Sequence, residues 1–296
     1  MSMLRRVGLA WLLAAAWVAG ARAQAARPKF AYPPVIDGAR VETYKRAGET
    51  ELKVWLFGVG EEGTAKPAIV FFFGGGWQRG SPEQFVRQGR WLAERGMVAV
   101  MADYRVASRD KAKPAECVAD AKSCVRWLRR NASRLGIDPR RIAAAGGSAG
   151  GHLAVAAATL PGLDEAGEDV AVSCVPDALV LFNPGVMMAP FGGLAMKGFG
   201  AGHTEERFGC AAEAISPIHH VRAGLPPTLI LHGTGDRTIP FATVEAFRDA
   251  MVKAGNRCEL VGYEGLDHGF YLAERYDETL KATADFLVSL GYLVAL

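Results

Sequence analysis

The chain has 296 residues, half of them hydrophobic, and its 34 basic and 31 acidic residues give a formal net charge of +3. This length and apolar content allow one large buried core, although length alone would also allow two domains. The basic excess comes from three arginines in the first 23 residues, and no basic stripe with interleaved aromatic residues follows, so nucleic acid is excluded as an expected partner.

Residues 1–23 have the pattern of a secretory signal peptide. Two arginines precede an apolar run over residues 7–19, and Ala21 and Ala23 supply small side chains for cleavage. The run is shorter than the ~20 residues that a membrane-spanning helix needs, so we expect cleavage after Ala23 and no stable membrane anchor. The mature chain, residues 24–296, is then expected to be a secreted or periplasmic protein.

From residue 41 onward, apolar runs of strand length alternate with amphipathic stretches of helix length. In chain order, we expect strands at residues 41–46, 52–59 and 68–73, a helix from Ser81 to Gly96, a strand at 97–102, a helix at 114–135, a strand at 141–145, a helix at 148–160, strands at 178–182 and 228–231, a helix at 240–254, a strand at 259–263 and a helix at 272–290. Strands separated by helices predict βαβ units and a mainly parallel sheet in a single domain. Residues 184–216 form a connection longer than most and are expected to cap the site.

The strongest motif is Gly146-Gly147-Ser148-Ala149-Gly150, a G-x-S-x-G between a predicted strand and a predicted helix. A nucleophile at the tip of so tight a turn has a strained backbone, and side chains two positions away would clash, which explains the glycines at 146 and 150. The following helix directs free N–H groups toward developing negative charge. We therefore predict Ser148 as the nucleophile; the alternative is a glycine-rich turn without chemistry.

A second glycine-rich segment, Phe73-Gly74-Gly75-Gly76-Trp77, follows the predicted strand at residues 68–73. Consecutive glycines let backbone N–H groups point at one oxygen atom, so Gly75, Gly76 and Ala149 are the candidate oxyanion-hole donors. A phosphate-binding loop is the alternative, but the pattern G-x-x-x-x-G-K-[ST] is absent from the sequence.

A nucleophilic serine needs a base, and the base needs an orienting carboxylate. In folds that place a nucleophilic serine between a strand and a helix in this way, the three catalytic residues follow one another along the chain in the order Ser, acid, His. His268, just after the last predicted strand in Asp267-His268-Gly269-Phe270, is therefore the candidate base. His232 is the second candidate for the base. His219 and His220 are expected at the start of a helix or at the rim of the site.

The candidate acid is Asp236, in the loop at residues 232–240 between a predicted strand and a predicted helix. An Asp that only caps the next helix is the alternative role. Asp267 adjoins the base in sequence and Asp177 precedes a strand, at the wrong edge of the sheet, so both are less suitable. Such a triad requires no metal ion and no organic cofactor.

Five cysteines follow the predicted signal peptide: Cys117, Cys124, Cys174, Cys210 and Cys258. An odd number leaves at least one thiol unpaired within the chain. Cys117 and Cys124 lie on one predicted helix, ~10.5 Å apart along its axis, which is too far for a disulfide. A bond between Cys174 and Cys210 is kept open, with buried free thiols as the alternative. No Cys/His cluster suggests zinc.

Taken together, the motifs resemble bacterial secreted esterases of the α/β-hydrolase superfamily, near the hormone-sensitive-lipase-like and the acetylxylan/feruloyl esterase groups. The resemblance runs from about residue 31 to the C terminus and includes the stretches Asp103-Tyr104-Arg105 and Gly136-Ile137-Asp138-Pro139-Arg140. It implies the α/β-hydrolase fold, with a mostly parallel eight-stranded sheet and helices on both faces, and the triad described above. It also implies that Asp103 and Arg105 form a buried ion pair.

One residue departs from the family pattern. Many relatives carry a His where this chain has Phe73, and that His braces the oxyanion loop through its side chain. Phe73 cannot do so, so packing must hold the loop here. The donors of the oxyanion hole are backbone groups and are expected to be preserved.

The expected activity is a serine carboxylesterase acting on short acyl or aryl esters, with acetyl or feruloyl esters on carbohydrate as the suggested substrates. Trp77 and Phe270, with Met187 and Met188, are expected to line an apolar substrate pocket, a core role being the alternative. Rival functions are a peptidase or amidase of the prolyl-oligopeptidase type, a lipase, and a non-catalytic binding protein. The chain lacks the length for the large gating domain of prolyl-oligopeptidase-type enzymes. The complete triad argues against a non-catalytic binding protein.

Overall fold

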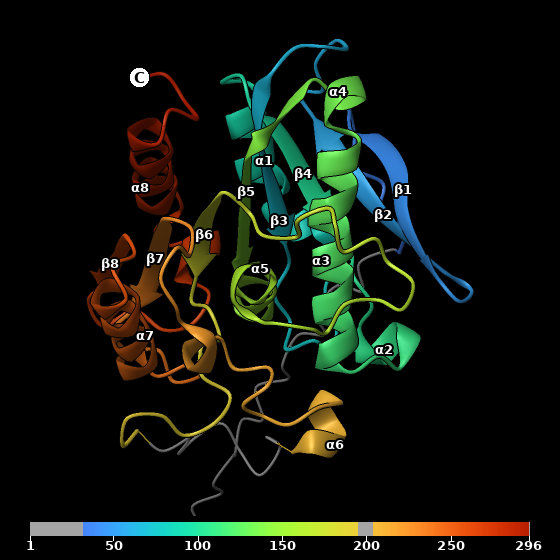
Figure 1. The fold of residues 1–296 in the computed structure, drawn as a ribbon. Helices are drawn as coiled ribbons and strands as arrows, with labels where there is room; N and C mark the ends of the chain where they lie inside the picture. Colours follow the sequence, from blue (N-terminus) through green and yellow to red (C-terminus); the bar gives the residue numbers. More distant parts are fainter. Residues whose placement is uncertain (1–31, 195–203, 296) are drawn as a thin grey trace, which may run out of the picture. The chain divides into compact units, whose positions relative to one another are not determined.

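The computed structural model describes residues 32–194 and 204–295, which contain an eight-stranded sheet with helices on both faces (Figure 1). The strand order is β1-β2-β4-β3-β5-β6-β7-β8. The strands are β1 Arg40–Ala47, β2 Thr50–Phe57, β3 Lys66–Phe72, β4 Val98–Ala102, β5 Ile137–Gly147, β6 Ala178–Phe182, β7 Thr228–Gly233 and β8 Cys258–Tyr263. Only β2 runs antiparallel to its neighbours β1 and β4; the other pairs in this part of the chain are parallel. The predicted fold class and the mostly parallel sheet are confirmed.

Helices cover the sheet on both sides, as Figure 1 shows. They are α1 Val86–Ala93, α2 Ala107–Asp110, α3 Pro114–Arg130, α4 Ala132–Leu135, α5 Ala149–Thr159, α6 Glu205–Phe208, α7 Phe241–Lys253 and α8 Tyr276–Ser289, with short 3₁₀ turns η1 Pro82–Phe85, η3 Pro217–His220 and η4 Phe270–Leu272. Buried residues of α3, α5 and α7 share one hydrophobic core with the sheet, and those of α1 and α8 share the other. The sheet therefore separates two cores.

The central strands are buried on both faces because each side of the sheet has its own core. In β3, Val70 and Phe72 belong to the core under α3 and α5, whereas Ile69 and Phe71 belong to the core under α1 and α8. Successive side chains of a strand point to opposite faces, so both sets must be apolar. This accounts for the uninterrupted apolar run in the sequence.

Element boundaries differ from the prediction in several places. The helix predicted from Ser81 to Gly96 begins as the 3₁₀ turn η1 and is an α-helix only as α1, and the helix predicted from residue 272 begins at Tyr276. The helix predicted over residues 114–135 is interrupted at Asn131, where α3 ends and the single turn α4 begins. The strand predicted at residues 141–145 begins earlier, because Ile137 already pairs with Lys66 at the start of β3. The polar residues between Ile137 and Ile142 hide this extension from a reading of apolar runs.

Several predictions concern residues outside the described part of the chain. The signal peptide at residues 1–23 lies there entirely, as do residues 195–203 of the expected cap. Among the described residues of the expected cap, three are buried in the core under α3 and α5: Val186, Met187 and Met188. The cap and the boundary of the mature domain stay predictions.

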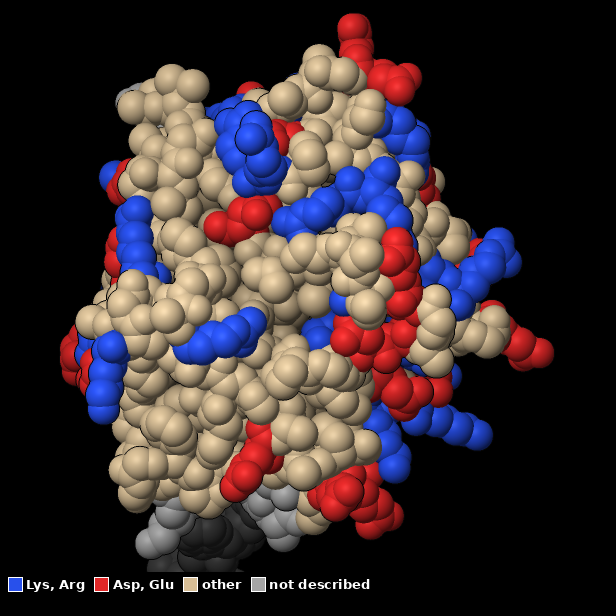
Figure 2. All heavy atoms as spheres, viewed as in Figure 1, with Lys and Arg blue, Asp and Glu red and all other residues tan. Residues whose placement is uncertain are grey.

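The described residues give three further results. On the face in Figure 2, basic and acidic side chains are interspersed, without a continuous basic band. No helix among the described residues is long and apolar enough to cross a membrane. All five cysteines are free thiols, so the bond between Cys174 and Cys210 that the sequence left open does not form.

Candidate active site

Ser148 stands at a sharp turn between β5 and α5. Its φ and ψ are 55° and −118°, a strained conformation for a residue with a side chain. A Cβ on Gly146 would lie 2.4 Å from the Gly150 backbone, and one on Gly150 would lie 2.0 Å from the Phe72 carbonyl oxygen. Neither position therefore accommodates a side chain, as the motif predicts.

Asp236 and His268 form a hydrogen-bonded pair from the loops after β7 and β8. His268 Nδ1 lies 2.8 Å from Asp236 Oδ2, and the Asp236 side chain is fully buried. The Oδ1 atom accepts hydrogen bonds of 2.8 Å from the N–H groups of Thr238 and Ile239. The carboxylate is thus fixed on one side by its own loop and aimed with the other oxygen at the imidazole.

His232, the second candidate for the base, contacts the acid instead. It is fully buried, and its Nε2 lies 2.9 Å from the Ile239 carbonyl oxygen and 3.2 Å from Asp236 Oδ2. Burial raises the pKa of Asp236, but hydrogen bonds from His232, His268 and the Ile239 N–H outweigh it and hold this pKa well below its usual value. Asp236 is therefore an anion throughout the neutral range, as an orienting carboxylate must be.

Asn183 connects the nucleophile to the acid–base pair, a role that the sequence analysis did not assign. The Ser148 N–H donates to the Phe182 carbonyl oxygen at 2.8 Å, and the next residue, Asn183, donates through Nδ2 to Asp236 Oδ2 at 2.6 Å. These contacts bring the ends of β5, β6 and β7 to one edge of the sheet. A polar residue directly after the apolar run of β6 was the available sequence signal.

The Ser148 hydroxyl is half-buried and makes no hydrogen bond with any of the residues that the structure describes. The contact between nucleophile and base is often long in free hydrolases and shortens when substrate is bound. The geometry thus supplies the oriented base and the strained nucleophile, while the Ser148–His268 hydrogen bond stays a prediction.

The remaining candidates have other partners. Asp267 binds Arg237 at the surface, and Asp177 accepts hydrogen bonds from Arg129 at 2.9 Å and the Ile142 N–H at 3.0 Å. The rim histidines are bound as well: His219 Nδ1 lies 2.9 Å from Ser216 Oγ, and His220 Nε2 lies 2.9 Å from the Glu213 carbonyl oxygen. Of these four residues, only Asp267 contacts the pair: its Oδ1 accepts the backbone N–H of His268 at 2.8 Å, which leaves the imidazole to Asp236.

The glycine loop after β3 lies against the nucleophile. A Cβ on Gly74 would be 3.3 Å from the Cβ of Ser148. The next two glycines have φ values that favour glycine, 137° at Gly75 and 65° at Gly76. Among the described residues, the N–H groups of Gly75, Gly76 and Ala149 have no hydrogen-bond acceptor. They remain the candidate donors to an oxyanion.

Phe73 holds this loop by packing, as expected from the loss of a His at this position. Its ring stacks on the Tyr104 ring at 4.1 Å between centroids, and the Tyr104 hydroxyl donates to the Phe73 carbonyl oxygen at 2.7 Å. A hydrogen bond therefore supplements the packing.

The predicted ion pair between Asp103 and Arg105 is wrong. Asp103 pairs with Arg109 of α2 at 2.9 Å, and Arg105 pairs with Asp120 of α3 at 2.7 Å. The chain turns after β4, so that Arg105 extends to α3 while α2 returns over Asp103. Arg109 also donates to the Gly80 carbonyl oxygen at 3.4 Å, which ties this pair to the end of the glycine loop.

The two predicted substrate-binding aromatic residues lie in different cores. Trp77 is 5% exposed and packs edge-on against His152 in the core under α3 and α5. Phe270 is in the core under α1 and α8, but it also lines a cavity of about 390 Å³ beside His268. Phe270 therefore remains a candidate for substrate contact, whereas Trp77 has a core position.

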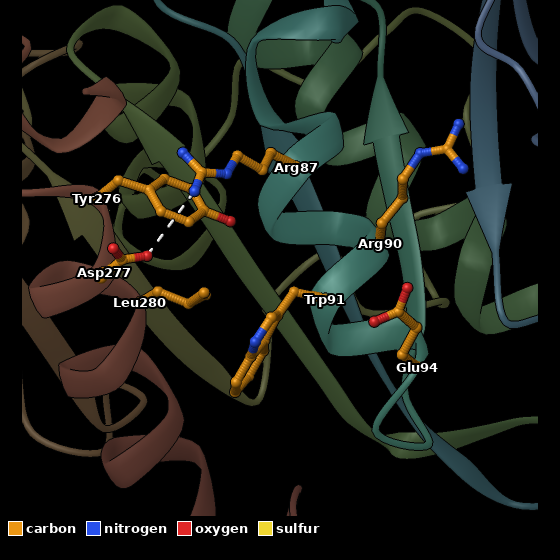
Figure 3. A pocket seen from close by; sticks show the side chains of 7 residues that line it. All are labelled: Arg87, Arg90, Trp91, Glu94, Tyr276, Asp277 and Leu280. Atoms are coloured by element: carbon orange, nitrogen blue, oxygen red, sulfur yellow. Dashed lines mark ion pairs between the residues drawn. The ribbon is translucent and has the colours of Figure 1, made fainter.

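A second hollow of about 280 Å³ lies between α1 and α8, away from the catalytic candidates (Figure 3). It is lined by Arg87, Arg90, Trp91, Glu94, Tyr276, Asp277 and Leu280. The Arg87 guanidinium lies over the Tyr276 ring, 3.4 Å from its centroid, and 3.8 Å from the Asp277 carboxylate. Arg90 and Glu94 bind groups outside the hollow, the Asp37 carbonyl oxygen and Arg95. The lining contains no Ser, Cys or His.

No group of three or more His, Cys, Asp or Glu side chains within residues 32–194 and 204–295 could hold a metal ion.

The site has three parts: a strained serine at a strand–helix turn, a histidine oriented by a buried aspartate, and a loop with free N–H groups. Together they define a serine hydrolase of the α/β-hydrolase fold.

The comparisons with known proteins agree with this class. Residues 58–176 match the family model BD-FAE, and residues 199–292 match the dienelactone hydrolase family. An esterase structure from Thermogutta terrifontis is 46% identical, covers 90% of this chain and 97% of its own, and has a TM-score of 0.85. The chain belongs to the esterases of the α/β-hydrolase superfamily.

More distant relatives are longer proteins. Esterase LipQ of Mycobacterium tuberculosis is 31% identical over 257 residues, which are 81% of this chain and 59% of LipQ. A probable isoprenylcysteine alpha-carbonyl methylesterase of Oryza sativa is 28% identical over 217 residues, which are 69% of this chain and 51% of the relative. The chain thus spans a little over half the length of these curated relatives.

Proposed function

We propose that this protein is a serine carboxylesterase that hydrolyses short acyl or aryl esters, with Ser148, His268 and Asp236 as its triad. The observation that carries the proposal is the buried Asp236 carboxylate, which is hydrogen-bonded to His268 and joined through Asn183 to the strand beside the Ser148 turn. No other described part of the molecule combines these groups.

The reaction proceeds in two steps. His268 accepts the Ser148 proton while the hydroxyl oxygen attacks the ester carbonyl carbon, and the N–H groups of Gly75, Gly76 and Ala149 stabilise the resulting oxyanion. Collapse of the tetrahedral intermediate expels the alcohol, which takes the proton from His268. Water then attacks the acyl-enzyme by the same route and releases the carboxylic acid.

The preference for short acyl groups is supported by the Thermogutta terrifontis esterase, of which propionate-bound and butyrate-bound structures are known. The BD-FAE match and the predicted export support acetyl or feruloyl esters on carbohydrate as natural substrates. Both suggestions, and a secreted or periplasmic location after cleavage at Ala23, are parts of the proposal.

The test is an activity screen of the protein comprising residues 24–296. Substrates are p-nitrophenyl esters of increasing acyl length, methyl ferulate, acetylated xylan and a peptide amide. We expect cleavage of the shortest p-nitrophenyl esters, and Ser148→Ala is expected to lower kcat by ~10⁴–10⁶.

Covalent labelling provides an independent measurement. The Thermogutta terrifontis esterase has been captured phosphorylated by paraoxon. Paraoxon should add one diethylphosphoryl group to Ser148, detected by peptide mass spectrometry, and none in Ser148→Ala. Peptide-amide cleavage as fast as ester cleavage would favour a peptidase, and a protein that is neither active nor labelled would favour a non-catalytic binding role.

A further inference from the structure

The side chain of Gln84 contacts the glycine loop of the proposed oxyanion hole. Gln84 lies in η1, a short turn whose start is fixed by Ser81, since the Ser81 hydroxyl accepts the Glu83 N–H at 3.3 Å. From there, Gln84 Oε1 accepts a hydrogen bond of 2.6 Å from the N–H of Gly74. The donor is a backbone N–H, so the side-chain oxygen must be the partner, which settles the orientation of the amide.

This contact is made beside the nucleophile. A Cβ placed on Gly74 would lie 3.3 Å from the Cβ of Ser148 and 3.5 Å from Gln84 Oε1. Gly74 is buried, and a buried N–H requires a hydrogen-bond partner. Gln84 supplies it, and the next two N–H groups along the chain, those of Gly75 and Gly76, remain without acceptors in the described residues.

The arrangement divides the loop into a fixed part and an open part. Three glycines in succession give a backbone with little intrinsic preference for one conformation. Peptide planes that share a Cα are coupled, so fixing the Gly74 N–H limits the directions of the two that follow. Preorganised donors stabilise an oxyanion better than donors that must first reorient.

We propose that Gln84 is a positioning residue of the oxyanion hole. Its side-chain carbonyl holds the Gly74 N–H, so that the N–H groups of Gly75 and Gly76 point to the oxyanion formed on attack by Ser148. This inference rests on the proposed esterase function.

The test replaces Gln84 with a residue of similar length that has no oxygen. In Gln84→Met, kcat for a p-nitrophenyl ester should fall by about tenfold to a hundredfold, because small misplacements of catalytic groups have effects of this size. KM should stay within about threefold, since the hole binds the transition state more than the ester. The affinity for an alkylboronic acid, whose tetrahedral serine adduct mimics the intermediate, should fall together with kcat.

Gln78→Met is the matched control. Gln78 lies in the same loop, is exposed, and its side chain makes no hydrogen bond with a described residue. This variant should retain the wild-type kcat, KM and boronic acid affinity. A folded Gln84→Met protein with unchanged kcat and boronic acid affinity would overturn the inference, and so would an equal loss in Gln78→Met.

Gln84→Leu covers the case in which Gln84→Met does not fold. It likewise removes the acceptor for the Gly74 N–H, and its side chain is shorter. We expect a folded protein with reduced kcat and weaker boronic acid binding; wild-type values would refute the role. If the wild-type protein hydrolyses no ester and is not labelled by paraoxon, the proposed function itself fails, which is a different outcome from an active wild type with unaffected Gln84 variants.

Discussion

The Tyr271 hydroxyl occupies the position that a side chain on Gly147 would need. A Cβ on Gly147 would lie 1.9 Å from the Tyr271 hydroxyl oxygen and 2.6 Å from its Cζ. The Tyr271 ring cannot easily withdraw, because it stacks on Phe85 and packs against Phe182. The residue before the nucleophile is therefore glycine for a reason outside the turn itself.

Gly147→Ala should destabilise the protein and lower its activity, because the added methyl group must displace Tyr271 or distort the turn at Ser148. We expect a loss of about 1–3 kcal/mol in the free energy of unfolding, as for other overpacked cores. Urea denaturation of Gly147→Ala, Tyr271→Leu and the double variant measures it. The double variant should lose less than the sum of the single losses, and simple additivity would contradict the steric explanation.

Residues in local motifs were predictable from the sequence, and residues that act across loops were not. Ser148, Asp236 and His268 each occupy a recognisable place between a strand and a helix, and the structure pairs the last two. Gln84 and Asn183 contact residues of other loops, so their partners cannot be predicted from the sequence, although the position of Asn183 directly after the apolar run of β6 was a signal. The same limit explains why Asp103 was assigned the wrong arginine.

Helix α3 is joined to the sheet through one buried carboxylate. Asp120 Oδ1 lies 2.7 Å from an Arg105 nitrogen and 2.6 Å from Lys45 Nζ, and the Asp120 side chain is fully buried. Arg105 follows β4, and Lys45 belongs to β1. This carboxylate thus contacts two cations from two different strand segments, which also share the partly exposed carboxylate of Glu165.

Asp120→Leu should therefore cost more stability than Arg105→Met. The first removes the fully buried partner of two cations and leaves them only the partly exposed Glu165 carboxylate, and breaking a buried pair in this way typically costs about 3–5 kcal/mol. The second leaves Asp120 paired with Lys45 and should cost about half as much.

Urea denaturation compares these variants with Lys281→Met. Lys281 forms an exposed pair with Asp285, so its replacement should change the unfolding free energy by less than ~1 kcal/mol. Equal losses for Asp120→Leu and Arg105→Met would show that Asp120 does not have the shared role. KM should be unchanged in all three variants.

The order and type of the elements were predictable, because both faces of the sheet demand apolar strands and each helix needs one apolar side. Boundaries were less predictable where polar residues continue an element. The start of β5 is polar and partly exposed, yet it pairs with β3. The break at Asn131 lies within an apolar repeat that continues into α4 and therefore leaves no gap in the pattern.

The stability of the protein should depend on pH through His152. This histidine is fully buried, its Nε2 lies 2.8 Å from the Ile215 carbonyl oxygen, and burial lowers its pKa from 6.5 to about 4. Between these two values the unfolded chain binds more protons than the folded one. The contribution of neutral His152 to the free energy of unfolding is therefore complete above pH 6.5 and is lost as the pH falls toward 4.

Thermal unfolding at the two ends of this pH window checks the prediction. The difference in Tm should be smaller in His152→Gln than in the wild type. His220→Gln, which alters a partly exposed histidine, should retain the wild-type difference. An unchanged pH response in His152→Gln would show that this imidazole is not responsible.

The proposed nucleophile and base differ in how firmly the sheet holds them. Ser148 follows β5, which has a neighbour on each side, whereas His268 follows β8, which is the last strand of the sheet and partly exposed. Terminal strands open at a lower free energy than central ones. Gentle warming should therefore separate the imidazole from its carboxylate while the middle of the sheet is still intact, so that inactivation begins before melting.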